Sequence, residues 1–575
     1  MIRIIFRTMS SIFKEESYME KEKYLKNLEE VSSLVKKDLA GNDELLDRIN
    51  NLVQSIRDFK VKVLCIGEFS AGKSAMLNSF LDINLLKEDI LPETAIATEL
   101  CYGEKEHVEL TDLEGKVSEC NFNQVQNYAA KDYLKYTYFL NNKKLALCKD
   151  YCFVDMPGFN SGIKAHNKAL IQYVGEVSVY ILAVDCVSGG LTASLINFIQ
   201  EIQRYSSHIA VVITKSDKRK QSDINEVQAE IAAEISGLLG YIPMIIPVSN
   251  REQEQLINSV NKIIHSFSTN ELFKERIDPI YEELVDSVYN MLEEKEKSTE
   301  LDTYALDENI KAKEKLKENL VKEIELKKKQ LHEELQNTAK NGILGDVAIA
   351  LNSHVDQLIE AASVSKENFS RAVNNIVRSV LLESSERYIG KSIEEFIGQL
   401  DFEQFIQESN SVDIRETIET SVKVVKDFGK KVGELSKSYK NSGNGKNMYR
   451  TVLSAIAIAT DIVAPWLELL LLFLPDIFEA VFGNIQKEKI RSTLLNTVIP
   501  DIISKLRIEI TKTLDDVEEE MAAAVEKKIT IQIEGEQEVL RQLKREKENA
   551  ENNVVEMKKE WKKDLNILKL MQEIV

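Results

Sequence analysis

Apolar residues are distributed along this 575-residue chain in two different patterns. Residues 15–58 repeat apolar positions at three- and four-residue steps, which places them on one face of a helix. Residues 59–268 instead carry short apolar runs bounded by turn residues and separated by helical patterns, as is typical of buried parallel strands. The clearest runs are 61–66, 152–154, 179–184 and 209–213. The pattern predicts a helix followed by an α/β domain with a mixed, mostly parallel sheet.

Long helices are predicted for almost all of the chain after residue 268. Pro279 is the only proline between 269 and 464, and none follows Pro500, while Glu, Lys and Leu are frequent. Gly342 and Gly345 break the helical pattern, and they are candidates either for a hinge or for an ordinary loop. The last helix has one apolar stripe, which consists of Val554, Met557, Trp561, Leu565 and Leu568.

The N-terminal helix, the helix after residue 268 and the C-terminal helix each have a single apolar stripe that must be buried. The simplest arrangement is an antiparallel bundle of these helices with one another. A dimer seam is the alternative, because coiled coils use stripes of the same kind.

Charge and cysteine content restrict the partners and the compartment. The formal net charge is −20, which makes the whole surface a poor binder of nucleic acid or anionic lipid. All six cysteines lie between residues 65 and 186, and none has metal-ligand spacing. They are predicted to be reduced and buried, as in a cytosolic protein. No cleavage site follows the apolar start, so no signal peptide is expected.

A phosphate-binding motif directly follows the first predicted strand. Residues 67–74 match the pattern GxxxxGK[ST] between a strand and a helix, which is the context this motif requires. Glycines let backbone N–H groups surround phosphate oxygens, and the helix N-terminus adds positive potential. Lys73 is expected to reach the β- and γ-phosphates, and Ser74 to ligate Mg²⁺. The predicted nucleotide-binding residues here are Gly67, Glu68, Phe69, Ser70, Ala71, Gly72, Lys73 and Ser74.

Two further motifs supply the expected metal and γ-phosphate contacts. Asp155 ends a predicted strand and begins the sequence DMPG, so its carboxylate is expected to hold Mg²⁺ through water and the Gly158 N–H to sense the γ-phosphate. A threonine in a mobile loop before the next strand is expected to complete the metal coordination. Thr98 is preferred over Thr94 for this role, on the family pattern given below.

The sequence TKSD at residues 214–217 predicts which base is bound. An aspartate carboxylate accepts hydrogen bonds from N1–H and the exocyclic amine of guanine, and adenine offers no such pair of donors. Asp217 is therefore expected to select guanine, because leaving it unpaired in a buried site is costly. Thr214 and Lys215 are also predicted to bind the nucleotide, with the Lys215 stem along the base plane, and Ser249 lies where a loop would cover the base edge. Helix capping by Asp217 is the structural alternative.

Together, the P-loop with Ser70 in its fourth place, PxTAxxT at 92–98, DMPG, TKSD and the flanking long helices resemble the bacterial dynamin-like proteins. The LeoA type is the narrower candidate. This resemblance covers about 210 residues by motif and the remainder by architecture alone. It implies that Ser70, Lys73 and Thr98 are catalytic and that Ser74, Thr98 and Asp155 hold Mg²⁺. Because Phe159 stands where Ras-type proteins have a catalytic Gln, hydrolysis of GTP to GDP and phosphate is expected to be slow unless two heads pair.

The resemblance also implies a division of the chain into a GTPase head, a helical neck and a trunk with a membrane-binding tip. The expected segments are 1–58, an N-terminal neck helix; 59–268, the GTPase domain; 269–440, neck and trunk; 441–485, the apolar tip; and 486–575, the returning trunk and neck helices.

Residues 452–482 form the most apolar stretch, yet acids and prolines interrupt it, so a transmembrane helix is not expected. Lysines and arginines precede and follow it, which suits amphipathic helices on an anionic bilayer. Under this hypothesis Trp466, Leu470 and Phe473 contact the membrane. The alternative is a helical hairpin with its apolar faces buried inside the trunk.

The sequence thus predicts a dynamin-like GTPase that binds guanine nucleotide and Mg²⁺ and couples hydrolysis to membrane remodelling or vesicle release. It is expected in the cytoplasm or peripherally on a membrane, and to form homodimers through its heads or to pair with other dynamin-like proteins, without a nucleic-acid partner. A GTP-switched helical scaffold that binds protein partners without touching lipid is the alternative function.

Overall fold

The structure is a computed structural model that describes most of the chain. The described residues are 2–68, 70–86, 96–112, 116–129, 132–156, 177–187, 190–202, 208–398, 487–549 and 554–572, with the single residues 466, 469, 470, 473, 474 and 478.

A nine-stranded sheet forms the centre of the head, in the order β4-β3-β5-β2-β6-β1-β7-β8-β9. The strands are β1 (Val61–Gly67), β2 (Ala97–Tyr102), β3 (His107–Asp112), β4 (Val117–Cys120), β5 (Tyr133–Leu140), β6 (Tyr151–Asp155), β7 (Val179–Asp185), β8 (Ile209–Thr214) and β9 (Met244–Pro247). From β6 through β1, β7 and β8 to β9 every pair is parallel, whereas β2–β6, β3–β5 and β3–β4 are antiparallel. The predicted mixed, mostly parallel sheet is confirmed.

Helices cover both faces of the sheet because side chains on adjacent strand positions point to opposite faces. The core on one face joins Val61, Val63 and Cys65 to residues of α3 (Lys73–Leu81) and α8 (Gln253–Ile264). The core on the other face joins Leu64 and Ile66 to residues of α6 (Ala193–Ile202) and α7 (Gln221–Leu239). Both faces of the central strands are therefore apolar, as the continuous apolar runs predict. The short helix α4 (Lys143–Leu147) precedes β6.

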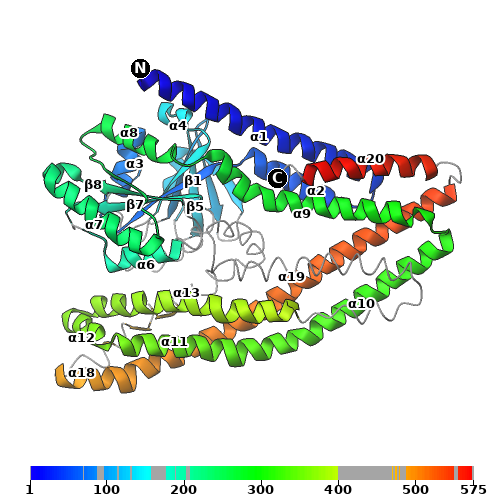
Figure 1. The fold of residues 1–575 in the computed structure, drawn as a ribbon. Helices are drawn as coiled ribbons and strands as arrows, with labels where there is room; N and C mark the ends of the chain where they lie inside the picture. Colours follow the sequence, from blue (N-terminus) through cyan, green and yellow to red (C-terminus); the bar gives the residue numbers. More distant parts are fainter. Residues whose placement is uncertain are drawn as a thin grey trace.

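A bundle of helices from both ends of the chain forms the neck beside the head (Figure 1). It contains α1 (Ile2–Asp38), α2 (Asp43–Arg57), α9 (Thr269–Lys297), α20 (Val554–Gln572) and the end of α19 (Ile499–Asn549). The predicted stripes are buried in it, with Leu28 and Val31 of α1 and Leu568 of α20 at 0% exposure and Trp561 of α20 at 1%. The predicted bundle of the N-terminal, post-head and C-terminal helices is confirmed.

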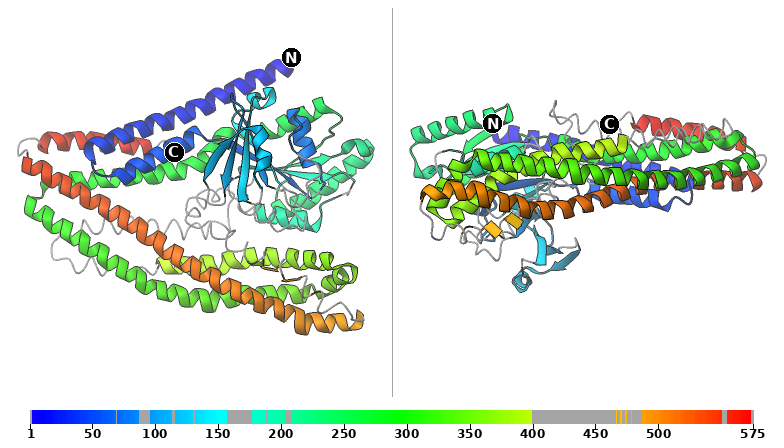
Figure 2. Two further views of the ribbon diagram at one scale, coloured as in Figure 1. Left: turned by 180° about the vertical axis from the view of Figure 1, so that it is seen from behind. Right: turned by 90° about the horizontal axis from the view of Figure 1, so that it is seen from below.

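The trunk turns back from the far end of the neck and lies alongside the head (Figures 1 and 2). Its long helices are α10 (Thr303–Glu333) and α19, which pack along each other, and its outer part contains α11 (Lys340–Ser353), α12 (Val355–Val364), α13 (Lys366–Gly398) and α18 (Lys487–Thr493). Helix α13 contacts α6 of the head. Among the described residues, no helix combines the length and apolar character needed to span a bilayer.

The two glycines predicted to break the trunk helix lie inside α11, so the prediction of an ordinary loop at this point is wrong, whereas the hinge stays a prediction. A π-helical segment, Glu334–Ala339, joins α10 to α11 without interruption. A Cβ atom on Gly342 would lie 2.5 Å from Cζ of Tyr388 in α13. This glycine therefore permits the close approach of two helices instead of ending one.

The apolar segment tests the membrane hypothesis at three described positions. Trp466, Leu470 and Phe473 are 0%, 0% and 6% exposed, and they belong to the trunk core. The Trp466 indole N–H donates a hydrogen bond of 3.0 Å to Oγ1 of Thr513 in α19. The assignment of these three residues to membrane contact is therefore corrected: the trunk helices cover their apolar faces. The remainder of the predicted tip at 441–485 lies almost entirely outside the described residues.

Buried charges mark the junction of neck and trunk. Lys313 of α10 and Glu536 of α19 are both 0% exposed and form a salt bridge, and Glu294 of α9 lies 3.8 Å from the same ammonium. Burial would lower the pKa of Lys313, but the two carboxylates outweigh it and raise that pKa above its ordinary value. The apolar pattern gave no sign of this cluster, because a lysine within a helical charge run is normally solvated.

Replacing Lys313 with Met is expected to lower the stability of the trunk by about 3–5 kcal/mol, because two buried carboxylates lose their cation. The matched control is Lys317→Met on the same helix, whose salt bridge with Glu534 is partly exposed, with side chains 31% and 54% exposed. Its expected cost is below about 1 kcal/mol. Urea unfolding followed by circular dichroism measures both midpoints. Equal shifts of the urea midpoint for the two variants would contradict a special role of the buried Lys313 salt bridge.

Candidate functional site

The phosphate-binding loop connects β1 to α3 and requires unusual backbone conformations. Gly72 has φ +84° and Ser70 has φ 62°, both in the left-handed region. A Cβ atom on Gly67 would lie 2.3 Å from the carbonyl oxygen of Ala183 in β7, so only glycine fits between these strands. Phe69 lies outside the described residues. The loop therefore connects the carboxyl end of a buried strand to the N-terminus of α3. A phosphate group would bind at this N-terminus, at the carboxyl edge of the sheet.

Lys73 is held inside this loop. Its side chain is buried, and its ammonium donates to the backbone oxygens of Gly67 at 3.2 Å and Glu68 at 3.0 Å. Burial lowers the pKa of Lys73 below its ordinary value, and the nearby Asp155 carboxylate opposes that shift. Carbonyl groups of the loop thus hold the ammonium beside the place that its phosphate partners would take.

Asp155 and Ser74 meet at the ends of β6 and the P-loop. The Ser74 hydroxyl donates to Oδ2 of Asp155 at 2.8 Å, and Oδ1 of Asp155 is buried without a hydrogen-bond partner among the described residues. Burial raises the pKa of Asp155 to about 6, against the opposing effects of Ser74 and Lys73. A buried carboxylate oxygen without a donor fits a hard cation, since Mg²⁺ prefers oxygen ligands.

Thr98 lies in β2, and the expectation of a mobile loop at this residue is wrong. It is paired with Asp155 in the antiparallel β2–β6 ladder, so the two residues lie opposite each other. Its hydroxyl donates to the backbone oxygen of Ile96 at 3.4 Å. The ladder thus brings the preferred threonine beside the Asp155 and Ser74 pair, whereas Thr94 and Gly158 lie outside the described residues.

The base-side residues gather at the ends of β8 and β9. The Ser249 hydroxyl donates to Oδ1 of Asp217 at 2.8 Å, and the Arg251 guanidinium lies 3.3 Å from Oδ2 of the same carboxylate. The Thr214 hydroxyl donates to the Ala71 carbonyl at 2.7 Å, which ties β8 to the P-loop. The short helix Ser216–Lys218 has Lys215 and not Asp217 at its N-cap, and the Asp217 carboxylate instead contacts the Ser249 and Arg251 side chains.

Lys215 links the base side to the phosphate side. It has φ 56°, and its ammonium donates at 2.7 Å both to the Ser70 carbonyl and to Oδ2 of Asp185. Burial would raise the pKa of Asp185, but hydrogen bonds from Lys215 and the Val187 N–H outweigh it and lower the pKa below its usual value. Asp185 was not singled out from the sequence. Its place directly after a buried strand was the signal that could have identified it.

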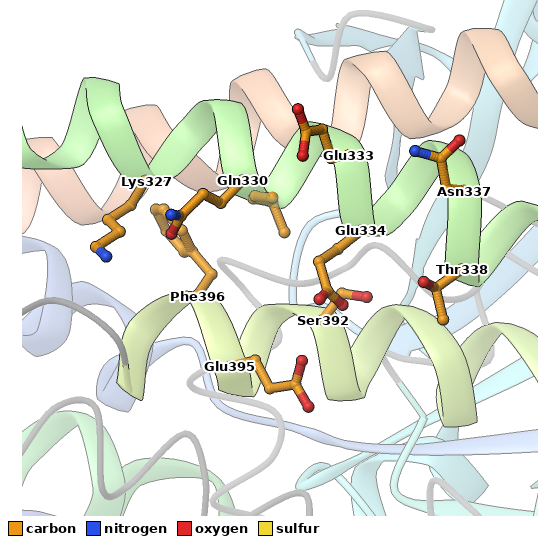
Figure 3. Close-up of a pocket in the computed structure, with 10 residues that line it drawn as sticks. Lys327, Gln330, Glu333, Glu334, Asn337, Thr338, Ser392, Glu395 and Phe396 are labelled. Carbon is orange, nitrogen blue, oxygen red and sulfur yellow. The ribbon is translucent and has the colours of Figure 1, made fainter.

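Two cavities differ in what they can bind. A cavity of about 120 Å³ adjoins the P-loop and is lined in part by Glu68, Ser70, Asp185 and Thr192. The Thr192 hydroxyl donates to Oε1 of Glu68 at 2.6 Å, which connects α6 to the P-loop. A larger cavity of about 430 Å³ lies between α10 and α13 in the trunk (Figure 3). None of the P-loop or base-motif residues lines it, so the nucleotide site is assigned to the head despite its smaller cavity.

The fold and the converging motifs define a P-loop GTPase domain. Residues 63–216 match the sequence profile of the Dynamin family. This segment is therefore a GTPase domain that resembles the dynamin family, and the predicted resemblance to dynamin-like proteins is confirmed. The narrower LeoA type stays a prediction.

Curated relatives share the head region. One is the probable transmembrane GTPase FZO-like, chloroplastic, of Arabidopsis thaliana, which is 25% identical over 213 residues. Another, from Caldicellulosiruptor sp. (strain Rt8B.4), is described as an uncharacterised protein in the xynA 3′ region and is 24% identical over 220 residues. Each match covers 36% of this chain, but 21% of the first relative and 51% of the second.

Among solved structures, a chain of an oligomerised bacterial dynamin pair, described in connection with long-range sensing and tethering of membranes, is similar at 14% identity. The match covers 95% of this chain and 99% of that chain, with a TM-score of 0.32. The likeness to the dynamin family rests on the sequence profile.

The raised pKa of Asp155 predicts how stability depends on pH in protein without nucleotide and metal. The folded state holds this proton up to about pH 6, whereas the unfolded state releases it near pH 4. This group therefore lowers the free energy of unfolding as pH rises from about 4 to 6, by up to about 3 kcal/mol. Asp155→Asn has no carboxyl group to titrate, so its free energy of unfolding does not fall in this way. The stability of the variant relative to the wild type should therefore rise between about pH 4 and pH 6. Parallel pH profiles of the two proteins would contradict the prediction.

Asp217→Asn is expected to weaken GDP binding by roughly 10- to 100-fold, because guanine loses a charged acceptor for its N1–H and amine. The variant should gain affinity for xanthine nucleotides, whose C2 carbonyl accepts a hydrogen bond from the asparagine amide. Competition of GDP and XDP against fluorescent GDP measures both changes, with Asp223→Asn on α7 as the matched control. Unchanged base preference would show that Asp217 does not contact the base.

Proposed function

We propose that this protein binds and hydrolyses GTP with Mg²⁺ and uses its helices to convert the nucleotide state into movement. The observation that carries the proposal is the convergence of two groups of side chains at the carboxyl ends of neighbouring parallel strands. Lys73, Ser74 and Asp155 form the phosphate side, and Asp217 with Ser249 forms the base side. Ligands of open α/β sheets bind at this edge.

Each residue of the phosphate side has a defined task in this proposal. Lys73 exchanges its carbonyl partners for the β- and γ-phosphate oxygens. Ser74, Thr98 and Asp155, the last through water, hold Mg²⁺. The bound cation would neutralise negative charge that develops on the phosphates during transfer. Ser70, Lys73 and Thr98 are the proposed catalytic residues, since they adjoin the place of the γ-phosphate.

Hydrolysis is proposed to be slow in the isolated protein. The sequence places Phe159 after Gly158, and phenylalanine has no group that can orient a water molecule. Water must then be positioned by backbone groups together with Ser70 and Thr98. Pairing of two heads across the nucleotide would complete the site, so a homodimer, or a pair with another dynamin-like protein, is the proposed active form.

Coupling to the helices is proposed to run through two contacts of the head. Thr192 connects the start of α6 to Glu68 of the P-loop, and α6 contacts the trunk helix α13. The neck helix α9 also follows directly after the head in the chain. A change at the γ-phosphate that shifts the P-loop or α6 would therefore bias how the trunk packs against the head.

Membrane remodelling or vesicle release is the proposed output, at a cytoplasmic site on a membrane surface. It is supported by the dynamin-family head and by the run of Lys and Arg between residues 423 and 450. A GTP-switched scaffold for protein partners is the second candidate. The burial of Trp466, Leu470 and Phe473 favours this second candidate, because it removes three apolar side chains from lipid contact.

GTP turnover with and without anionic vesicles is expected to separate the two candidates. A membrane-acting protein should hydrolyse GTP faster, by about tenfold or more, when lipid concentrates and pairs the heads. Lys73→Ala provides the blank. Turnover that is equal with and without lipid would leave the GTPase proposal intact but contradict membrane coupling.

A further inference from the structure

A histidine and two acids from different helices meet on the outside of the trunk, far along the chain from the nucleotide site. His332 lies near the end of α10, and Asp515 and Glu518 lie on α19. Nδ1 of His332 is 2.6 Å from Oε2 of Glu518 and 3.8 Å from Oδ1 of Asp515. The three atoms all lie within 4.8 Å of one another, so one small cation could contact all of them.

The helices fix the positions of these three side chains. Asp515 and Glu518 are three residues apart on α19, which places them on the same helix face. A direct chain neighbour of each of the three belongs to the apolar core of the trunk: Leu331 precedes His332, Leu514 precedes Asp515 and Val517 precedes Glu518. The backbones that carry the ligand groups are therefore held by packing, which is the condition for a preorganised site.

A neighbouring amide supports the acid that is farther from the imidazole. The Gln336 side chain donates to Oδ1 of Asp515 at 2.7 Å and to the Thr511 carbonyl at 3.1 Å, which orients this carboxylate. The Glu518 side chain is 15% exposed, whereas those of His332 and Asp515 are half-exposed. One carboxylate thus lies in a less hydrated environment, while the outer side stays open to water ligands.

We propose that His332, Asp515 and Glu518 form a structural site for one divalent transition-metal ion of the Zn²⁺ type. An imidazole nitrogen with two carboxylates suits Zn²⁺, Co²⁺ or Ni²⁺, whereas Mg²⁺ prefers oxygen ligands alone. Two carboxylates balance the charge of the ion, and water completes the coordination. A simple ion pair between protonated His332 and Glu518 is the alternative, and it requires no metal.

The bound ion would connect the outgoing trunk helix to the returning one. Helices α10 and α19 run side by side (Figure 1), and the site precedes the π-helical segment Glu334–Ala339 by less than one turn of helix. A cation that binds only the folded trunk raises its stability by mass action. The ion would therefore stabilise the pairing of α10 with α19 where the regular α-helical hydrogen bonding of α10 ends.

Titration with Co²⁺ tests the proposal in the full-length protein. GDP and excess Mg²⁺ saturate the head first, and visible absorption then reports Co²⁺ in an imidazole-containing site. We expect one equivalent to bind, and His332→Ala to weaken binding by more than about tenfold, a loss that even outer-sphere groups cause. Zn²⁺ should raise the thermal midpoint of the wild type but not of the variant.

Two further variants make the outcome decisive. His354→Ala removes another exposed imidazole, whose contacts are with Ser353 and the Ala350 carbonyl only among the described groups, and it should bind Co²⁺ as the wild type does. Glu518→Gln keeps the shape of the side chain and should lose binding. The proposal is overturned if the wild type gives no saturable Co²⁺ signal, as the ion-pair alternative requires, or if His332→Ala binds Co²⁺ unchanged.

Discussion

The architecture depends on the need of three single-stripe helices to bury their apolar faces. Helix α1 begins the chain, α9 follows the head, and α20 ends the chain, and none can be stable in water by itself. Their mutual packing buries Leu28, Trp561 and Leu568 and brings both ends of the chain to the neck. Because α9 leads out to the trunk and α19 leads back, the same packing determines where the trunk begins. The neck is thus the place where the head and the trunk join.

Buried charged groups are concentrated at the junction of neck and trunk, where α10 and α19 must pack in one register. The neck packs mainly through apolar side chains, yet its junction with the trunk buries Lys313 and Glu536, and Lys295 is buried there against Glu546 and the Trp561 ring. Buried ion pairs add little net stability because desolvation opposes them. They do penalise any packing that separates the partners. The junction therefore favours a particular register of α10 against α19, and that register also brings His332 to Asp515 and Glu518.

Sequence reasoning succeeded where local pattern and chemistry act together. The P-loop could be predicted because its residues lie within a single strand, loop and helix. Asp155 and Asp217 each come at or just after the end of a predicted parallel strand, so these motifs could be placed at the same sheet edge. It failed where distant segments decide the outcome. Thr98 joins a strand because β6 pairs with it, Gly342 lies in a helix that Tyr388 of α13 approaches closely, and Trp466 is buried against α19. The trunk folding back along the head has no signature in any local window.

The central claim is that nucleotide binding in the head changes how the trunk packs against it. All six native cysteines are buried, so spin labels can be attached selectively at Glu226→Cys on α7 and Ser363→Cys on α12. Double electron–electron resonance spectroscopy then measures the distance between the two labels, first with GDP and then with a non-hydrolysable GTP analogue and Mg²⁺. The account predicts that the distance distribution differs between the two states and that Lys73→Ala removes the difference. The same distribution in both states would contradict it.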